Sequence, residues 1–249
     1  MATRSTFGDT TDTGGYVVSP AKRGNPKLSM VGDDTWSEYE RLAAQFEASS
    51  AEEIAAWAVE RFGRKLSLVC SFQNCVLIDL VTRVDPKVEV IFLDTGAHFP
   101  ETMTYVERVE TQYQLKLRII TPESDADAWP CGSERCCELR KTLPLGRALQ
   151  GQEAWMSGIK RVDGAARAAT PIVEWDEARG LLKINPVATW THDDVSHYEA
   201  DRKLPIHPLF RQGYLSIGCS PTTRPVSKLE DRRAGRWPGT DKTECGLHL

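Results

Sequence analysis

The chain has 249 residues, a formal net charge of −4 and 41% hydrophobic residues, an ordinary composition for a globular protein. This length allows one large domain or one domain with extensions, and the small net charge does not indicate a nucleic-acid or membrane partner. No apolar stretch approaches the roughly 20 residues of a membrane-spanning helix, and the N-terminus lacks the apolar core of a signal peptide. We therefore expect a cytoplasmic protein with a disordered arm over residues 1–34, a main domain over 35–240 and a mobile tail over 241–249.

The first half of the chain alternates between helical and strand patterns. Residues 35–62 have the apolar spacing of helices, and Ser49 and Ser50 are expected to form a cap between two of them. Strands are expected at residues 66–70, 88–93 and 115–120, with helices at 76–81 and 100–113. This alternation predicts an α/β fold, a parallel twisted sheet with flanking helices and right-handed crossovers.

Two polar loops follow the first two predicted strands. The carboxyl ends of parallel strands are where ligands bind in such sheets, and a polar turn before a helix presents backbone N–H groups to an anion. Neither loop is one of the glycine-rich phosphate-binding motifs, so each signal is weak when taken alone. The candidate binding residues in these loops are Ser71, Phe72, Gln73, Asp94, Thr95 and Gly96.

The second half of the chain has a looser pattern. Strands are expected at residues 154–158 and 181–184, and Thr191 is expected to cap a helix over 192–201. From residue 209 onward Gly, Pro and Arg dominate, which predicts a long irregular segment. Basic residues gather between 135 and 167 and between 224 and 242, and local basic clusters in an acidic protein suit a small polyanionic ligand.

The C-terminal tail contains a cysteine in an unusual position. Cys245 lies four residues from the end of the chain, where burial in a core is not expected. A thiol is a useful nucleophile only as the thiolate, which the nearby Lys242 and His248 would favour. Gly246 would allow the tail to swing, and the alternative is that Cys245 is an incidental terminal cysteine.

Seven cysteines, an odd number with Cys136 and Cys137 adjacent, indicate thiol or metal chemistry rather than a secreted disulfide framework. Adjacent cysteines do not readily form a disulfide with each other, so this pair suits a metal cluster or redox partners elsewhere. We expect Cys70 and Cys75 to be small buried hydrophobic residues.

Five segments in order along the chain closely resemble those of the sulfonucleotide reductases, the adenylyl-sulfate and phosphoadenylyl-sulfate reductases of sulfate assimilation. They are residues 91–96, 136–141, 158–161, 213–219 and 242–248. The resemblance covers roughly residues 40–249 and implies a sheet of the adenine-nucleotide alpha-hydrolase type with an irregular C-terminal tail.

The resemblance also implies a mechanism. Cys245 attacks the sulfur of the nucleotide, AMP leaves, and an S-sulfocysteine forms on the enzyme. A thiol donor such as thioredoxin then attacks this cysteine and frees sulfite. The residues implied to hold the phosphate and sulfate are Ser71, Phe72, Gln73, Arg140, Lys141, Lys160, Arg161, Arg236 and His248.

One position departs from the pattern of the family. Members that use adenylyl sulfate carry a [4Fe-4S] cluster on a Cys-Cys pair and a C-x-x-C pair, and such clusters have four thiolate ligands. This chain has counterparts at Cys136, Cys137 and Cys219, but Thr222 replaces the last ligand. Three outcomes stay open: a three-cysteine cluster, a cluster with Cys131 as the fourth ligand, or none.

We expect adenylyl sulfate as the substrate, with phosphoadenylyl sulfate as the alternative, and a chain that could form a homo-oligomer. An ATP-cleaving adenylyltransferase on the same sheet is a rival hypothesis. It would need a glycine-rich pyrophosphate loop, which residues 71–74 do not provide, and it would leave Cys245 unexplained. A non-enzymatic rival is a nucleotide-binding iron–sulfur or redox sensor.

Overall fold

A computed structural model describes residues 33–122, 124–227 and 229–247 of the chain. The expected N-terminal arm lies outside the described residues as far as residue 32, and helix α1 (Asp33–Phe46) begins at the next residue. Within the part of the chain that the structure describes, no helix has the length and apolar character needed to cross a membrane.

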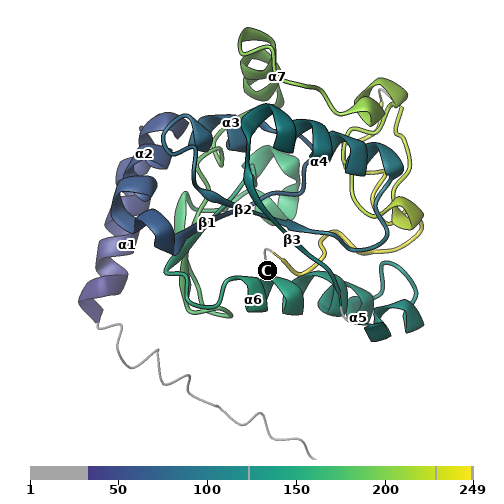
Figure 1. The fold of residues 1–249 in the computed structure, drawn as a ribbon, viewed down its shortest axis with the longest axis horizontal. Coiled ribbons are helices and arrows are strands. Elements are labelled where there is room, and N and C mark those ends of the chain that lie inside the picture. The colour runs from purple at the N-terminus through teal and green to yellow at the C-terminus, as the bar shows by residue number, and fades with distance from the viewer. Residues whose placement is uncertain (1–32, 123, 228, 248–249) are drawn as a thin grey trace, which may run out of the picture.

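A six-stranded sheet forms the centre of the fold, with strand order β3-β2-β1-β4-β6-β5 (Figure 1). All neighbouring strands are parallel except β5, which runs antiparallel to β6 at the edge. The predicted α/β class with a parallel sheet is therefore confirmed. The strands are β1 (Leu66–Val69), β2 (Glu89–Leu93), β3 (Lys116–Ile120), β4 (Ala154–Ser157), β5 (Val173–Asp176) and β6 (Leu181–Ile184).

Helices cover both faces of this sheet, and Figure 1 shows α3 and α4 on one side of it and α5 and α6 on the other. The helices after α1 are α2 (Ala51–Phe62), α3 (Val76–Thr82), α4 (Pro100–Tyr113), α5 (Glu134–Cys137), α6 (Leu143–Ala148) and α7 (His192–Asp201). The sequence predicted the positions of α2, α3, α4 and α7, because each has apolar spacing or a capping residue that acts within a few neighbours.

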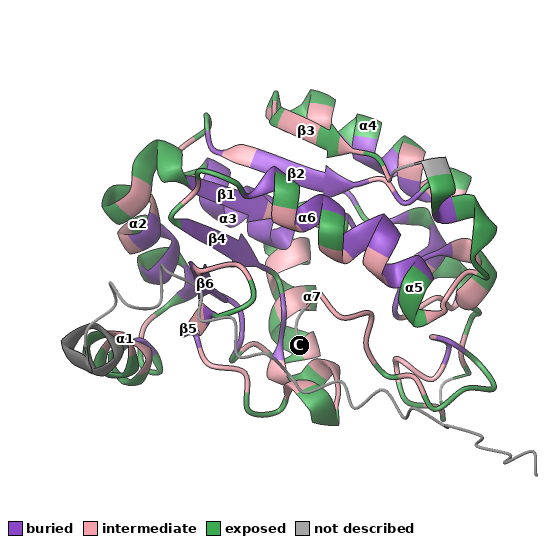
Figure 2. Ribbon diagram, turned by 90° about the horizontal axis from the view of Figure 1, so that it is seen from below, coloured by how far each residue is buried: buried purple, intermediate pink, exposed green. Residues whose placement is uncertain are grey.

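The alternation of side chains along β2 divides the core between the two faces. Val90 and Phe92 belong to the larger apolar cluster beneath α2, α3 and α4. Ile91 and Leu93 point to the opposite face and pack with Leu145 of α6. Successive residues of a strand point to opposite faces, so a strand covered on both sides is apolar throughout, and Figure 2 shows β2 buried over most of its length.

Strand β5 was missing from the sequence-based prediction. It is a four-residue edge strand that contains Glu174 and Asp176, so its sequence lacks the apolar run of a central strand. Its position depends on the antiparallel pairing with β6 and on α1, where the ring of Tyr39 stacks on Trp175 with centroids 6.0 Å apart. The pairing with β6 is a local hairpin, whereas the contact with α1 joins residues far apart in the sequence.

A capping box begins α2, as expected from the sequence. The hydroxyl of Ser50 accepts a hydrogen bond from the Glu53 backbone N–H, and the Glu53 carboxylate accepts one from the Ser50 N–H. These bonds satisfy two N–H groups that the helix itself leaves without partners.

We expect Ser50→Ala to lower the free energy of unfolding by about 1 kcal/mol, because the helix loses its capping oxygen. Urea denaturation followed by circular dichroism would measure this change. Ser49→Ala is the matched control, since Ser49 lies next to the cap without being the N-cap residue. Equal stability of the two variants would contradict this role of Ser50.

Candidate active site

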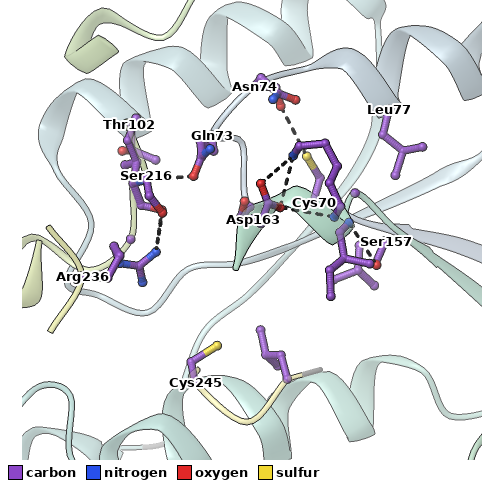
Figure 3. A pocket seen from close by; sticks show the side chains of 18 of the residues that line it. Cys70, Gln73, Asn74, Leu77, Thr102, Ser157, Asp163, Ser216, Arg236 and Cys245 are labelled. Carbon is purple, nitrogen blue, oxygen red and sulfur yellow. Dashed lines mark hydrogen bonds and ion pairs between the residues drawn. The ribbon is translucent and has the colours of Figure 1, made fainter. Parts of the chain in front are cut away.

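A cavity of about 420 Å³ opens at the carboxyl ends of β1, β2 and β4 (Figure 3). Its lining includes the loops that follow these three strands and parts of the irregular C-terminal segment. This volume is within the range of pockets that hold a small molecule, and the location is the expected one for a parallel sheet.

The loop after β1 presents most of its side chains to this cavity. Ser71 and Gln73 line it, and the Gln73 side-chain oxygen accepts a hydrogen bond from the Ile217 N–H at 2.9 Å. Phe72 has a φ of 54° and is fully buried, with its ring edge-on to Phe92. The structure therefore places Phe72 in the core beneath the loop rather than among the cavity-lining residues.

The loop after β2 contributes Thr95 to the cavity, while Asp94 and Gly96 shape the turn around it. The Asp94 carboxylate accepts a hydrogen bond from the Gly96 N–H at 2.9 Å. The Thr95 hydroxyl lies 3.5 Å from the sulfur of Cys219, which connects this loop to the C-terminal segment.

The predicted cations divide into two groups. Lys141, Lys160 and Arg236 line the cavity. Arg161 instead makes two hydrogen bonds to the Glu47 carboxylate, at 2.6 and 2.8 Å, and one to the Thr170 carbonyl oxygen.

Arg140 is also directed elsewhere, because it donates hydrogen bonds to the Thr95 carbonyl oxygen and the Asp127 carboxylate. The structure does not bring Arg140 or Arg161 to the cavity lining.

Three arginines that sequence reasoning did not select also line the cavity, namely Arg167, Arg232 and Arg233. Their signal was present in the sequence as part of the two basic stretches. The sequence does not show which member of a basic stretch points inward. Burial lowers the pKa of Arg233 and of Arg236, and repulsion between neighbouring arginines lowers both further.

A helical segment with a π-helical turn positions Lys141. Residues Glu138–Thr142 form this turn between α5 and α6, a feature that is frequent at functional sites. Burial lowers the pKa of Lys141, but its interactions with the thiols of Cys219, Cys245 and Cys137 outweigh this and raise it overall. Lys141 therefore stays positively charged although only 9% of its surface is exposed.

Cys245 also lines the cavity, on the opposite side from Gln73 in Figure 3. Lys141, Arg167, Arg233 and Arg236 each interact electrostatically with Cys245. Reactive cysteines are found in such electropositive and partly exposed surroundings. His248, the other predicted residue of the tail, lies outside the described residues.

Several cysteines lie near this cavity as free thiols. Cys136, Cys137 and Cys219 are buried, and the sulfur of Cys137 accepts a hydrogen bond from the Lys242 ammonium group at 3.2 Å. Cys131 interacts with Cys219, which lowers the pKa of Cys219 and raises that of Cys131.

Thr222 packs directly against the turn that contains Cys131. A Cβ atom on Gly132 would lie 2.8 Å from the Thr222 methyl group, and the Thr222 hydroxyl interacts with the Cys131 thiol. Among residues 33–122, 124–227 and 229–247, no three His, Cys, Asp or Glu side chains are arranged as ligands of a single metal ion.

The two other cysteines lie close to the β1 loop. Cys75 is buried as expected, and burial raises its pKa to about 11. Cys70 differs from the expectation because it lines the cavity, although burial raises its pKa to about 12. Both thiols are therefore protonated near neutral pH, in contrast with the requirement for a nucleophile.

Fold and cavity together define an α/β protein with a cationic, thiol-containing pocket at the ends of parallel strands. Residues 65–225 match the family model described as the phosphoadenosine phosphosulfate reductase domain. The chain is 43% identical to adenosine 5′-phosphosulfate reductase of Streptomyces coelicolor and 41% identical to that of Mycolicibacterium smegmatis. These alignments cover 84% of this chain and 92% and 93% of the relatives.

Solved structures agree with this assignment. Phosphoadenylyl-sulfate reductase from Candida auris has a TM-score of 0.66 at 28% identity, covering 75% of this chain and 96% of that one. FMN adenylyltransferase from Candida glabrata has a TM-score of 0.54 at 15% identity, over 85% and 86% of the two chains, and shares the fold. The chain belongs to the phosphoadenosine phosphosulfate reductase family, so the predicted resemblance to sulfonucleotide reductases and the oxidoreductase class are confirmed.

Gly218 leaves room for Arg236, because a Cβ at this position would lie 2.1 Å from the Arg236 guanidinium. We expect Gly218→Ala to displace Arg236 and to weaken AMP binding about tenfold, roughly 1.4 kcal/mol. Isothermal titration calorimetry would measure this change.

Gly146→Ala is the matched control for this substitution. A Cβ at Gly146 meets no atom within 4 Å, and the residue lies within α6, so alanine should fit there without loss of binding. Equal AMP affinity of the wild type and both variants would contradict the role given to Arg236.

Proposed function

We propose that the protein catalyses the thiol-dependent reduction of adenylyl sulfate to sulfite and AMP in cytoplasmic sulfate assimilation, with Cys245 as the nucleophile. The observation that carries this proposal is the position of Cys245 at a cavity that Lys141, Arg167, Arg233 and Arg236 also line. A thiol and a cluster of cations at one cavity suit attack on a sulfur atom that is attached to a phosphate leaving group.

In the first step, the Cys245 thiolate attacks the sulfur of the sulfate group. A bond forms between the two sulfur atoms, and the bond from sulfur to the bridging oxygen breaks. The electron pair of that bond leaves with AMP, and the enzyme becomes an S-sulfocysteine. Cations around the developing phosphate charge would stabilise this step, because the cavity is already organised to receive negative charge.

In the second step, a dithiol donor of the thioredoxin type attacks the Cys245 sulfur. Sulfite leaves with the electron pair of the sulfur–sulfur bond, and a mixed disulfide forms. The second thiol of the donor then displaces Cys245 as a thiolate. The donor is oxidised to a disulfide, and the substrate sulfur is reduced by two electrons.

We assign the nucleotide to the side of the cavity opposite Cys245, where Ser71, Gln73 and Thr95 lie at the ends of β1 and β2. Lys160, buried beside the end of β4, also lines the cavity and supplies a charge for phosphate. We propose adenylyl sulfate over its 3′-phosphorylated form because the relatives at 41–43% identity are named adenosine 5′-phosphosulfate reductases.

We expect Cys245→Ser to lower sulfite release by at least about a thousandfold, because a hydroxyl is far less nucleophilic than a thiolate. Sulfite assay with adenylyl sulfate and reduced thioredoxin would measure turnover, and mass spectrometry without the donor should find the sulfonate on the wild-type Cys245 peptide. Cys75→Ala is the control, since Cys75 lies in the core. Turnover by Cys245→Ser at the wild-type rate would contradict the proposal.

We also propose a [4Fe-4S] cluster, which Cys136, Cys137 and Cys219 near the cavity would hold. Each thiolate of such a cluster binds a different iron atom, so the sulfurs need not converge as they would on a single ion. We propose Cys131 as the fourth ligand, because it interacts with Cys219 and Cys136 and lies against Thr222. When bound, the cluster would join α5 to the segment around Cys219.

This ligand set predicts a loss and a rescue. Cys131→Ser should lower the iron content and the visible absorption of protein purified without oxygen. The double variant Cys131→Ser/Thr222→Cys should restore both, because a soft fourth ligand returns from the neighbouring position.

Cys75→Ala again serves as the control for the iron measurement. Iron content that is unchanged by Cys131→Ser would exclude Cys131 as a ligand. A wild-type protein without iron would contradict the cluster itself.

A further inference from the structure

The residue before Cys245 is a glutamate whose carboxylate is held in the protein interior. The side chain of Glu244 is only 7% exposed. It accepts hydrogen bonds from Nε of Arg167 at 2.6 Å and from Nη2 of the same residue at 2.7 Å. Such a two-point contact between a guanidinium and a carboxylate fixes orientation as well as distance.

A second arginine holds the same part of the tail. Nη2 of Arg233 donates to the Thr243 carbonyl oxygen at 2.8 Å and lies 3.3 Å from the Glu244 carboxylate. The backbone and the side chain immediately before Cys245 are therefore both attached to the arginines that line the cavity.

The chain after Cys245 has an anchor of a different kind. Gly246 has a φ of 83°, which turns the chain, and Leu247 packs against the apolar cluster that includes Leu145 and Trp155. Cys245 thus lies between an ionic attachment and an apolar one. Lys242 attaches the chain further upstream, through its bond to Cys137, so the contacts of Glu244 are the attachment nearest to the thiol on that side.

Arg167 is already fully engaged by carboxylates of the protein. Its Nε and Nη2 contact Glu244, and its Nη1 lies 3.3 Å from Asp163. Asp163 in turn pairs with Lys160 at 3.2 Å. Each nitrogen of the guanidinium therefore contacts a carboxylate of the protein, which points to a role in holding the tail.

We propose that Glu244 is a positioning residue that docks the tail and holds the Cys245 thiol at the cavity through Arg167 and Arg233. This inference rests on the proposed function only in taking Cys245 as the nucleophile. Loss of the negative charge removes the carboxylate that the two buried arginines share, and the amide nitrogen of a glutamine would face a guanidinium nitrogen. Glu244→Gln should therefore release the tail without changing its length.

The reactivity of Cys245 can be measured without turnover. Trypsin cleaves after Lys242, so the terminal peptide, residues 243–249, contains Cys245 as its one cysteine. Alkylation of this peptide by iodoacetamide, measured from about pH 6 to about pH 10, brackets the ordinary pKa of a thiol. The midpoint reports the ionisation of the thiol, and the limiting rate at high pH reports its accessibility.

The matched control is Glu230→Gln, which removes a carboxylate from another arginine pair in the C-terminal segment. Glu230 pairs with Arg224 at 2.6 Å on the surface, and neither residue lines the cavity. We expect the limiting rate to rise about tenfold in Glu244→Gln, because charge-assisted hydrogen bonds that exclude the reagent are lost. In Glu230→Gln it should stay within about twofold of the wild type.

A second measurement separates positioning from ligand binding. Formation of the S-sulfocysteine in a single turnover should slow in Glu244→Gln, while the affinity for AMP stays within about twofold. A shift of the alkylation midpoint with an unchanged limiting rate would overturn the inference. So would a loss of AMP affinity with unchanged alkylation. Faster alkylation of Glu244→Gln would still support the docking role if the wild type released no sulfite. That second result would contradict the proposed function alone.

Discussion

Positive charge buried at the carboxyl ends of the parallel strands is the constraint on which the rest of this site depends. Lys141 and Arg236 lose hydration there, and Arg236 also meets the repulsion of Arg233. A buried cation needs an anion or a hydrogen-bond acceptor to offset this loss. In the protein these partners are the thiols around Lys141, the Ser216 hydroxyl and the Ile217 carbonyl oxygen for Arg236, and Glu244 for Arg233. A nucleotide that carries phosphate and sulfate supplies the same kind of partner from outside.

The C-terminal segment owes its position to the sheet rather than to its own secondary structure. Its regular elements are short turns such as η7 (Pro208–Gln212) and η8 (Ser220–Thr222), together with one bridge between Thr223 and Arg236. The Ile217 N–H donates to Gln73, and the Ser220 N–H donates to the Ala97 carbonyl oxygen at 2.7 Å. The loops that follow the parallel strands thus serve both as cavity lining and as the support for the segment that closes it.

Fold alone does not distinguish this protein from enzymes with other chemistry. The FMN adenylyltransferase of Candida glabrata shares the sheet at 15% identity, so the architecture is compatible with nucleotide chemistry of more than one kind. The distinction lies in the cavity. Cys245 lines it together with Lys141, from the turn between α5 and α6, and with Arg233 and Arg236. A glycine-rich pyrophosphate loop is not present after β1, where residues 71–74 are Ser-Phe-Gln-Asn.

The sequence by itself determined the α/β class, most of the helices and the five parallel strands. These features depend on periodicity and on caps such as Ser50, which act over three or four residues. It also singled out Cys245 as a candidate nucleophile, and the structure places this residue at the cavity. The family resemblance added Cys136, Cys137 and Cys219 as a set.

Tertiary structure decided the direction of individual side chains. Phe72 and Ser71 are neighbours in one loop, but a positive φ sends the aromatic ring into the core. Arg161 and Arg167 belong to the same basic stretch, yet Glu47 holds the first away from the cavity and Glu244 holds the second beside it. Glu244 is 77 residues from Arg167 along the chain, and no local pattern encodes such a pair. The two charges meet only in the folded protein. Because both side chains are buried there, each needs the other as a partner.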